Sequence, residues 1–420
     1  MHRIAAALMV ATSCVAVAQA QELSTAEQGA SAFTLDQAVA AAGGSAPSAD
    51  AAQAGIDAAK AARTVAGLRP NPQLQSQIEN VAGTGPYGGL DQAETTVGVN
   101  LPIELGGKRS ARIAVANAQT DRAVLVAAIT QADIRLQITA LYVEAVAAER
   151  RAETARDQFR IAQDALRAAK IRVQAGRASP LEEQRADVAR LNAQAGLERT
   201  QRLADAARIN LARRIGQPVA GPFDATALDR MPSAIYGPRL ATSEGTLALA
   251  AADADLAVAN AGIQLARSQM VPDVTVGPAV RRLSATNDTA AVFSITLAIP
   301  ISSSGRAAVS QAKEERTRVE SQRRMTALDV EQAITDAQAE ADNAATMAQT
   351  ASGPALAAAQ EAARIARIGY REGKFGQLEL LDAERVLADI RVAAIDALAT
   401  YQNAKARLER LTAPAPTQGN

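Results

Sequence analysis

Aromatic side chains, histidine and cysteine are scarce in this chain, and each scarcity excludes a class of protein. Aromatic residues make up 2% of the 420 residues and tryptophan is absent, whereas an enzyme of this length normally has many rings in its core and pocket. The single His and the single Cys, His2 and Cys14, lie near the N-terminus. These counts argue against histidine general bases, disulfides and His/Cys metal sites, so we expect no metal site and no cofactor.

An excess of charge of one sign is also missing. The chain has 44 Lys and Arg residues and 44 Asp and Glu residues, so we expect no nucleic-acid partner, because such a partner needs a basic field. Hydrophobic residues nevertheless amount to 48%, and alanine supplies much of that share. The bias toward Ala, Arg, Gln, Glu and Leu predicts long helices whose axes approach closely.

Residues 1–20 have the pattern of a secretory signal peptide. Arg3 gives a short positive region, and the apolar stretch 4–17 that follows is too short to span a bilayer. Ala18-Gln19-Ala20 is a small-x-small cleavage site. We expect cleavage between Ala20 and Gln21, and lipidation at Cys14 is the alternative. No later segment has ~18 uninterrupted strongly apolar residues, so we expect no transmembrane helix.

The rest of the chain is a duplication with an offset of about 200 residues, since three landmarks recur in the same order. Residues 71–74 are echoed by 271–274, residues 101–109 by 299–306, and residues 176–182 by 373–379. This period is far too long for a short-repeat solenoid. We therefore predict a first repeat over 21–215, a linker over 216–240, a second repeat over 241–412 and a disordered tail over 413–420.

Each repeat contains a segment with the alternating pattern of a β-hairpin. The hairpins are predicted over about 72–104 and 273–301, where residues such as Val97, Val99 and Leu101 alternate with polar residues. In the second hairpin a loop is predicted over 284–288 and alternation over 293–301. The strands have the length and pattern of membrane-spanning barrel strands. Two soluble hairpins, each with one face on a core, would give the same pattern.

Helical hairpins follow, over about 107–215 and 305–412. The run 107–175 contains no proline, which favours one long helix. Gly176 and Gly373 are placed to end helices, and Pro180 to begin one. The turns at 176–179 and 373–377 are therefore the tips of the two helical hairpins. The last helix carries a seam with 3-4 spacing, made of Leu380, Ala383, Leu387, Ile390, Ala394, Ala397, Tyr401, Ala404, Leu408 and Leu411.

This order of elements resembles the TolC-type outer membrane factors over nearly all of the mature chain. The segments 69–74 and 101–109, Arg-Pro-Asn-Pro-Gln-Leu and Leu-Pro-Ile-Glu-Leu-Gly-Gly-Lys-Arg, look like the CzcC-like heavy-metal efflux branch. The second tip, Gly369-Tyr370-Arg371-Glu372-Gly373 followed by 378–383, is similar to the family's C-terminal tip. The resemblance implies a mainly α fold with a transmembrane β-barrel in the outer membrane lipid, extending into the periplasm.

The resemblance also implies an assembly and a function. Four strands per chain cannot close a barrel, because even the smallest barrels need about eight. A homotrimer would supply a twelve-stranded barrel continued by a periplasmic α-helical tunnel. Its tips, at Gly176, Ser179, Gly373 and Gly376, would dock onto a periplasmic adaptor that joins an inner-membrane RND pump. The chain would be a passive conduit, for divalent heavy-metal cations or, alternatively, for drugs and other small molecules.

Four residues at the tips are candidates for a periplasmic gate. By resemblance, Glu379 and Asp382 match the two acidic residues that close the periplasmic end in the TolC pattern. They lie three apart, so they share one helix face, and threefold symmetry would make each a ring of carboxylates. In the first repeat Glu182 matches Glu379 but Arg185 replaces the second acid, so a Glu379–Arg185 pair could lock the opening. The simpler alternative is that both acids are solvated tip residues that pair with Arg385 or Arg371.

Two functions of other classes compete with a channel. A periplasmic adaptor also has a signal peptide and a coiled-coil hairpin, but it carries one tip rather than two. An exported hydrolase would have to work without histidine after signal cleavage, and a carboxylate pair is the chemistry left to it.

Overall fold

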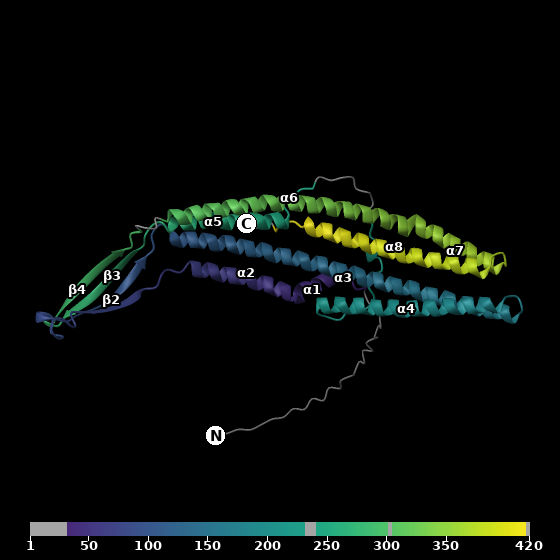
Figure 1. Cartoon of the computed structure of the whole chain (residues 1–420), viewed down its shortest axis with the longest axis horizontal. Coiled ribbons are helices and arrows are strands. Elements are labelled where there is room, and N and C mark those ends of the chain that lie inside the picture. The colour runs from purple at the N-terminus through teal and green to yellow at the C-terminus, as the bar shows by residue number, and fades with distance from the viewer. Residues whose placement is uncertain (1–31, 232–240, 301–304, 417–420) are drawn as a thin grey trace, which may run out of the picture.

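The computed structural model describes residues 32–231, 241–300 and 305–416. The predicted cleavage site at Ala20 and Gln21 lies outside the described residues, as does Cys14. The described chain is a long stalk of helices with a small sheet at one end and two helical tips at the other (Figure 1).

The order of elements is similar in the two halves. The first half consists of α1 (Leu35–Ser45), α2 (Pro47–Ala66), β1 (Gln73–Glu79), β2 (Glu94–Ile103), α3 (Lys108–Gln174) and α4 (Pro180–Ile215). The second half consists of α5 (Leu247–Ser268), β3 (Val274–Leu283), β4 (Asp288–Leu297), α6 (Arg306–Thr350), α7 (Leu356–Arg371) and α8 (Gln377–Leu411). A π-helical turn, Ala351–Ala355, joins α6 to α7 and contains Pro354. At 67 residues, α3 is about 100 Å long.

The four strands form one antiparallel sheet in the order β1-β2-β3-β4. The two hairpins join through the pairing of β2 with β3, where Val97 lies opposite Val280. One face is apolar and exposed, with Leu74, Ile78, Val97, Val99, Leu101, Ile103, Val280, Phe293, Ile295 and Leu297. The other face carries polar residues such as Gln75, Thr96 and Asn100. Within the described chain, β1 and β4 are the two unpaired edges.

The second strand of the second hairpin lies earlier than the sequence pattern predicts. The prediction placed alternation over 293–301 and a turn over 284–288, whereas β4 begins at Asp288 and ends at Leu297. Asn287 takes the left-handed conformation at φ 56°, which allows a tight turn directly before Asp288. Pro300 lacks the N–H that a ladder needs, and residues 301–304 lie outside the described residues.

Two segments expected to be linker and tail are partly built into the fold. Phe223 and Leu228, within the predicted linker, are buried, and Phe223 forms a bridge with Phe33. Residues 413–416, the start of the predicted disordered tail, pair with the chain before α5, since the Ala415 amide donates to the Gly245 carbonyl over 2.9 Å. Both segments lack periodicity because they are fixed by isolated contacts rather than by a repeating face.

The main core lies midway along the stalk and is rich in alanine. It brings together side chains of α1, α3, α4, α6 and α8. Tyr142 is at its centre: its hydroxyl donates to the Phe33 carbonyl over 2.8 Å, and its ring meets the ring of Phe223 edge-on at 5.4 Å. The seam on α8 is broader than predicted: Leu387, Ala394, Tyr401 and Ala404 are buried as expected, Ile395 and Leu398 are buried as well, and Leu408 is only half-buried. Small alanine side chains allow this close approach of helices without a thick core.

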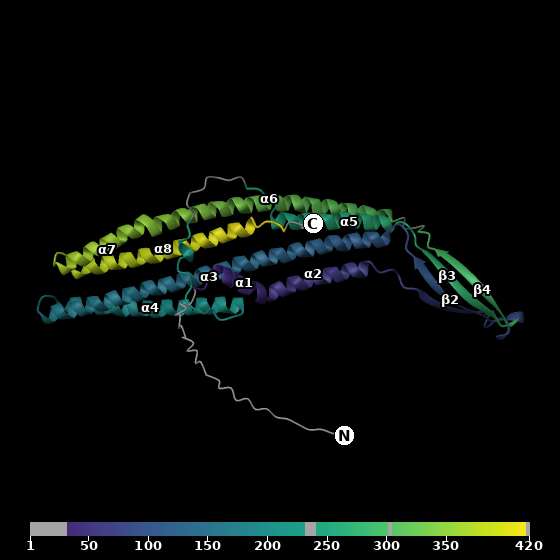
Figure 2. The ribbon, with the colours of Figure 1, turned by 180° about the vertical axis from the view of Figure 1, so that it is seen from behind.

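By length and composition alone, one helix among the described residues, α3, could cross a membrane. The sequence analysis expected no transmembrane helix because no stretch of strongly apolar residues is uninterrupted, and length and composition alone do not test that expectation. In the structure α3 packs against α1, α2, α4, α5 and α8, and both views of the ribbon show it running along the stalk (Figure 2).

Replacing Tyr142 with Phe should destabilise the stalk by about 1 kcal/mol at neutral pH, because it removes one buried hydrogen bond. Burial raises the pKa of Tyr142 to about 12, from about 10 in an unfolded chain. The raised pKa favours the folded, protonated state, so its contribution is complete below about pH 10 and is lost as pH rises toward 12. The melting temperature of the unmodified protein should therefore fall toward that of Tyr142→Phe between pH 10 and 12, and parallel curves would contradict this role.

Candidate functional site: the helical tips

The first tip, residues 172–185, is a tight turn between α3 and α4. Gly176 takes φ 67°, and the Arg177 amide donates back to the Arg172 carbonyl over 2.8 Å, which closes the end of α3. Ser179 caps α4, since its hydroxyl accepts from the Leu181 amide. The sequence therefore fixes this turn with one glycine and one cap.

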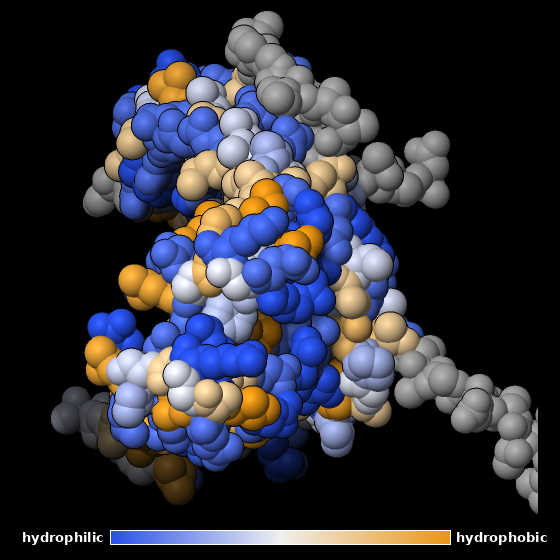
Figure 3. Space-filling model, turned by 90° about the vertical axis from the view of Figure 1, so that its right-hand side faces the viewer, coloured by the Kyte–Doolittle hydropathy of each residue, from blue (hydrophilic) through white to orange (hydrophobic). Residues whose placement is uncertain are grey.

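The second tip, residues 369–385, uses the same device. Gly373 takes φ 71°, and the Lys374 amide donates to the Gly369 carbonyl over 2.8 Å. The ring of Phe375 lies so close to Gly369 that a Cβ at that position would collide with it. Gly376 precedes α8 without a side-chain cap. Seen from the tips, the molecular surface is mostly hydrophilic with apolar patches between (Figure 3).

A polar cluster connects the two tips within one chain. The Arg172 guanidinium lies 5.3 Å from the centre of the Tyr370 ring and 3.7 Å from the Glu182 carboxylate, and the Tyr370 side chain raises the pKa of Arg172. The buried atoms Glu182 Oε2, Tyr370 Oη and Gln377 Nε2 have no hydrogen-bond partner among the described residues. Unpartnered buried polar groups are costly, so this contact between the tips is weakly held and can rearrange at little cost.

The structure separates the four predicted gate residues. Glu182 is half-buried in the cluster between the tips, whereas Arg185, Glu379 and Asp382 are exposed. Within the described residues neither Glu379 nor Asp382 has an ion-pair partner, and Arg385 pairs instead with Asp389. Within one chain, therefore, no Glu379–Arg185 pair forms among the described residues, and a pair between neighbouring copies stays a prediction.

Sequence reasoning missed Arg172, Tyr370 and Gln377. Tyr370 was part of the motif that carried the resemblance, and its position three residues before Gly373 was the available signal. Arg172 meets Tyr370 only because two segments about 200 residues apart come together, which periodicity does not reveal. In the described residues, no group of three or more His, Cys, Asp and Glu side chains is arranged to hold a metal ion.

The model of the outer membrane efflux protein family matches residues 39–217 and 242–413. The chain belongs to this family. The match confirms the resemblance seen in the motifs and places the protein in the outer membrane, extending into the periplasm. It leaves the adaptor and hydrolase alternatives without support.

Similar proteins agree with this assignment. The chain is 29% identical to the cobalt-zinc-cadmium resistance protein CzcC of Cupriavidus metallidurans, over 90% of each chain. It is 30% identical to the nickel and cobalt resistance protein CnrC of the same organism, over 62% of this chain and 61% of that protein. Its fold matches the open-state structure of the MtrE outer membrane channel of Neisseria gonorrhoeae, with a TM-score of 0.73, 21% identity, and coverage of 90% of this chain and 88% of that one.

Behind the second tip, this outer membrane efflux protein holds α7 against α8 with an ion pair whose carboxylate is buried and whose arginine is 45% exposed. The Glu384 side chain is 3% exposed; it accepts from Nε of Arg367 and, over 2.8 Å, from Nη2. The Gln158 amide of α3 donates to the Glu384 carbonyl over 3.3 Å. The α3–α8 contact continues through Arg151 and Asp396, 2.7 Å apart. These contacts couple the two hairpins just above the tips.

Arg367→Ala should lower the stability of the second tip by roughly 2–3 kcal/mol, because it leaves the Glu384 carboxylate buried without a partner. The matched control is Arg364→Ala on the same helix, whose pair with Glu361 is more than half exposed on both sides and should change stability by less than about 1 kcal/mol. Thermal unfolding of the purified protein measures both. Adding Glu384→Gln to Arg367→Ala should restore part of the loss, and equal melting temperatures for the two single variants would contradict the role of the buried carboxylate.

Proposed function

We propose that this outer membrane efflux protein is the channel component of a tripartite efflux system that exports divalent heavy-metal cations. The observation that carries the proposal is the similarity to CzcC over 90% of both chains, because that protein confers resistance to cobalt, zinc and cadmium. The match to CnrC, a nickel and cobalt resistance protein, supports the same class of cargo. Efflux of drugs is the second candidate, since the fold alone does not select the cargo.

The active channel is a homotrimer. A single sheet has two open edges and an exposed apolar face, and three such sheets joined β1 to β4 would close a twelve-stranded barrel whose apolar face meets lipid.

The helices at the margins of the stalk support the same assembly. Helix α4 lies at one margin and α6 at the other (Figure 2). Packing α4 of one copy on α6 of the next would cover the large apolar side chains that both helices expose. These are Val188, Leu191 and Leu203 on α4 and Met325, Leu328 and Met347 on α6.

The tips form the periplasmic gate and the docking site for the adaptor. In the trimer, Glu379 and Asp382 supply rings of carboxylates near the start of α8, where the helix dipole favours negative charge. The cluster of Arg172, Glu182 and Tyr370 holds the hairpins together in the closed state. The glycine turns at Gly176 and Gly373 are the exposed surfaces that an adaptor meets, and an inner-membrane RND pump supplies the driving force.

Deleting the gene should make its host sensitive to divalent metal ions, and complementation with the full chain should restore resistance. Growth is measured across cobalt, zinc, cadmium and nickel salts and a panel of drugs. Sensitivity to the metals with unchanged drug tolerance is the expected result. Sensitivity to drugs alone would reject the metal proposal and favour the second candidate.

Replacing both Glu379 and Asp382 with Ala should lower cation selectivity in planar-bilayer conductance and weaken block by multivalent cations, because the carboxylate rings are removed. Stability should hardly change, since exposed charges contribute little. The matched control is the pair Glu314→Ala and Asp329→Ala on α6, which are also exposed acids and lie far from the tips. Unchanged selectivity in the tip variant would show that the two acids are ordinary surface residues.

A further inference from the structure

Basic side chains gather where the sheet meets the helices. We call this region the foot of the sheet: residues 62–72, 102–112, 264–274 and 305–310, which join the strands to α2, α3, α5 and α6 (Figure 1). Its basic residues are Arg63, Arg69, Lys108, Arg109, Arg112, Arg267 and Arg306. Its acidic residues are Glu104 and Asp273. The foot therefore carries a large positive excess in a chain whose total charge is zero.

The tips at the other end of the stalk show that this excess is local. Residues 172–185 and 369–385 together contain six basic and six acidic residues. Charge is balanced at the tips and unbalanced at the foot, although both regions lie at ends of long helices. A general need for solubility does not explain the difference, because both ends are exposed.

Both acids of the foot are already neutralised inside the chain. Lys108 Nζ lies 2.7 Å from Asp273 Oδ1, and Arg112 Nη2 lies 3.0 Å from Glu104 Oε2. Arg69, Arg267 and Arg306 are exposed, and none of the three has a hydrogen-bond or ion-pair partner among the described residues. These three guanidinium groups are free to meet an anion from outside the chain.

The helices that begin at the foot reinforce its positive field. α3 and α6 start after Gly107 and Gly305 without a side-chain cap and with no acid in the first turn, and their first residues are basic. The helices that begin at the tips follow the opposite rule, with Glu182 and Glu183 in the first turn of α4 and Glu379 in that of α8. The N-terminus of a helix favours negative charge. The first turns of α3 and α6 lack the acidic side chains that the first turns of α4 and α8 contain.

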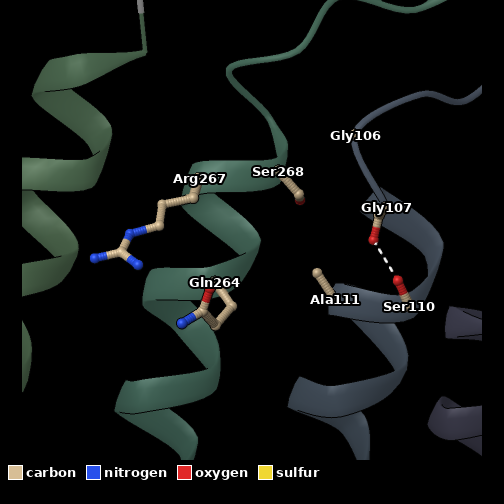
Figure 4. Close-up of a pocket in the computed structure, with 7 residues that line it drawn as sticks. All are labelled: Gly106, Gly107, Ser110, Ala111, Gln264, Arg267 and Ser268. Atoms are coloured by element: carbon tan, nitrogen blue, oxygen red, sulfur yellow. Dashed lines mark hydrogen bonds between the residues drawn. The ribbon is translucent and has the colours of Figure 1, made fainter.

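Two cavities lie at the foot, and the first has walls suited to a headgroup. One, of about 390 Å³, is lined by Arg69, Arg109, Ile103, Glu104 and two prolines. The Glu104 carboxylate is already paired with Arg112, and Ile103 is the last residue of the exposed apolar face. The other, of about 430 Å³, lies between α3 and α5 (Figure 4). Ser110 and Ser268 line it, and Arg267 extends from α5 away from Gly107. The first cavity therefore places two guanidinium groups directly beside the edge of the apolar face.

We propose that the foot of the sheet binds the phosphate groups of anionic phospholipids in the membrane leaflet nearest the periplasm. The inference rests on the proposed function, because it takes the apolar face as the surface of a barrel in lipid. Anionic lipids are the occupant that the position favours, since their acyl chains would continue over Ile103 and the apolar face while the phosphate meets Arg69 and Arg109. The alternative is that the basic residues of the foot face the pore. Positive charges there would oppose the passage of the cations that the channel is proposed to export.

The test compares lipid binding by the full-length protein and by two charge-matched variants. The foot variant combines Arg69→Gln, Arg267→Gln and Arg306→Gln. The control combines Arg156→Gln, Arg199→Gln and Arg213→Gln, which are also exposed and unpaired among the described residues but lie on the stalk. Native mass spectrometry counts phosphatidylglycerol and phosphatidylcholine retained from nanodiscs that contain both. Parallel samples receive millimolar inorganic phosphate.

The unmodified protein and the control should retain phosphatidylglycerol in preference to phosphatidylcholine. The foot variant should lose this preference by roughly a hundredfold, since each basic residue near an anionic surface contributes about fivefold. Equal loss in both variants, no lipid preference in the unmodified protein, or displacement of the lipid by inorganic phosphate would each overturn the proposal. Channel conductance in phosphatidylcholine bilayers is measured alongside: its absence rejects the proposed function, whereas conductance without lipid preference rejects only this inference.

Discussion

The rest of the structure depends on the fact that four strands cannot close on themselves. The sheet has open edges at β1 and β4 and an apolar face that no element of the described chain covers. An open edge presents unpaired amide and carbonyl groups, which cannot remain unsatisfied in lipid. In the proposed assembly the chain is therefore a fraction of a closed barrel, and its stalk places copies of the sheet side by side. The length of α3 and the alanine-rich packing around it provide that support.

In the proposed trimer the stalk is thin because it has to leave a central passage. A solid domain of this length would fill its centre with large apolar side chains. Here most buried residues are alanine, and the buried rings of Tyr142, Phe223 and Tyr401 belong to one core cluster. Contacts between α3 and α8 provide part of the stability that a larger core would otherwise provide. The Arg151–Asp396 pair and the buried Glu384 lie along this contact, and below them the cluster of Arg172 and Tyr370 holds the tips with few satisfied hydrogen bonds. The tips are therefore held by fewer satisfied contacts than the middle of the stalk, which suits the gate proposed there.

The sequence predicted the parts of the fold that repeat a simple pattern. The period of two at Val97, Val99 and Leu101 indicated the strand, and the proline-free run after Gly107 indicated α3. The glycines at 176 and 373 indicated the tips, because only a left-handed turn fits there. The start of β4 was not predicted because the successive alanines Ala290 and Ala291 interrupt the alternation of apolar and polar residues. The contact of Tyr370 with Arg172 was not predicted because it depends on how two distant hairpins lie together. The position of Phe223 beside Phe33 was not predicted because it depends on isolated contacts, which leave no periodic pattern in the sequence.

The account is tested most directly by joining β1 of one copy to β4 of the next. In one chain these strands are separated by β2 and β3, about 14 Å at the usual strand spacing, which is too far for a disulfide. The natural cysteine, Cys14, lies in the predicted signal peptide, so single cysteines can be placed at Gln75 in β1 and, in turn, at Val292, Ser294 or Thr296 in β4. Oxidation of outer membranes from cells that produce these variants should give a ladder of linked chains that stops at three. Monomers at every position, or a ladder that continues past three, would contradict the closed trimeric barrel.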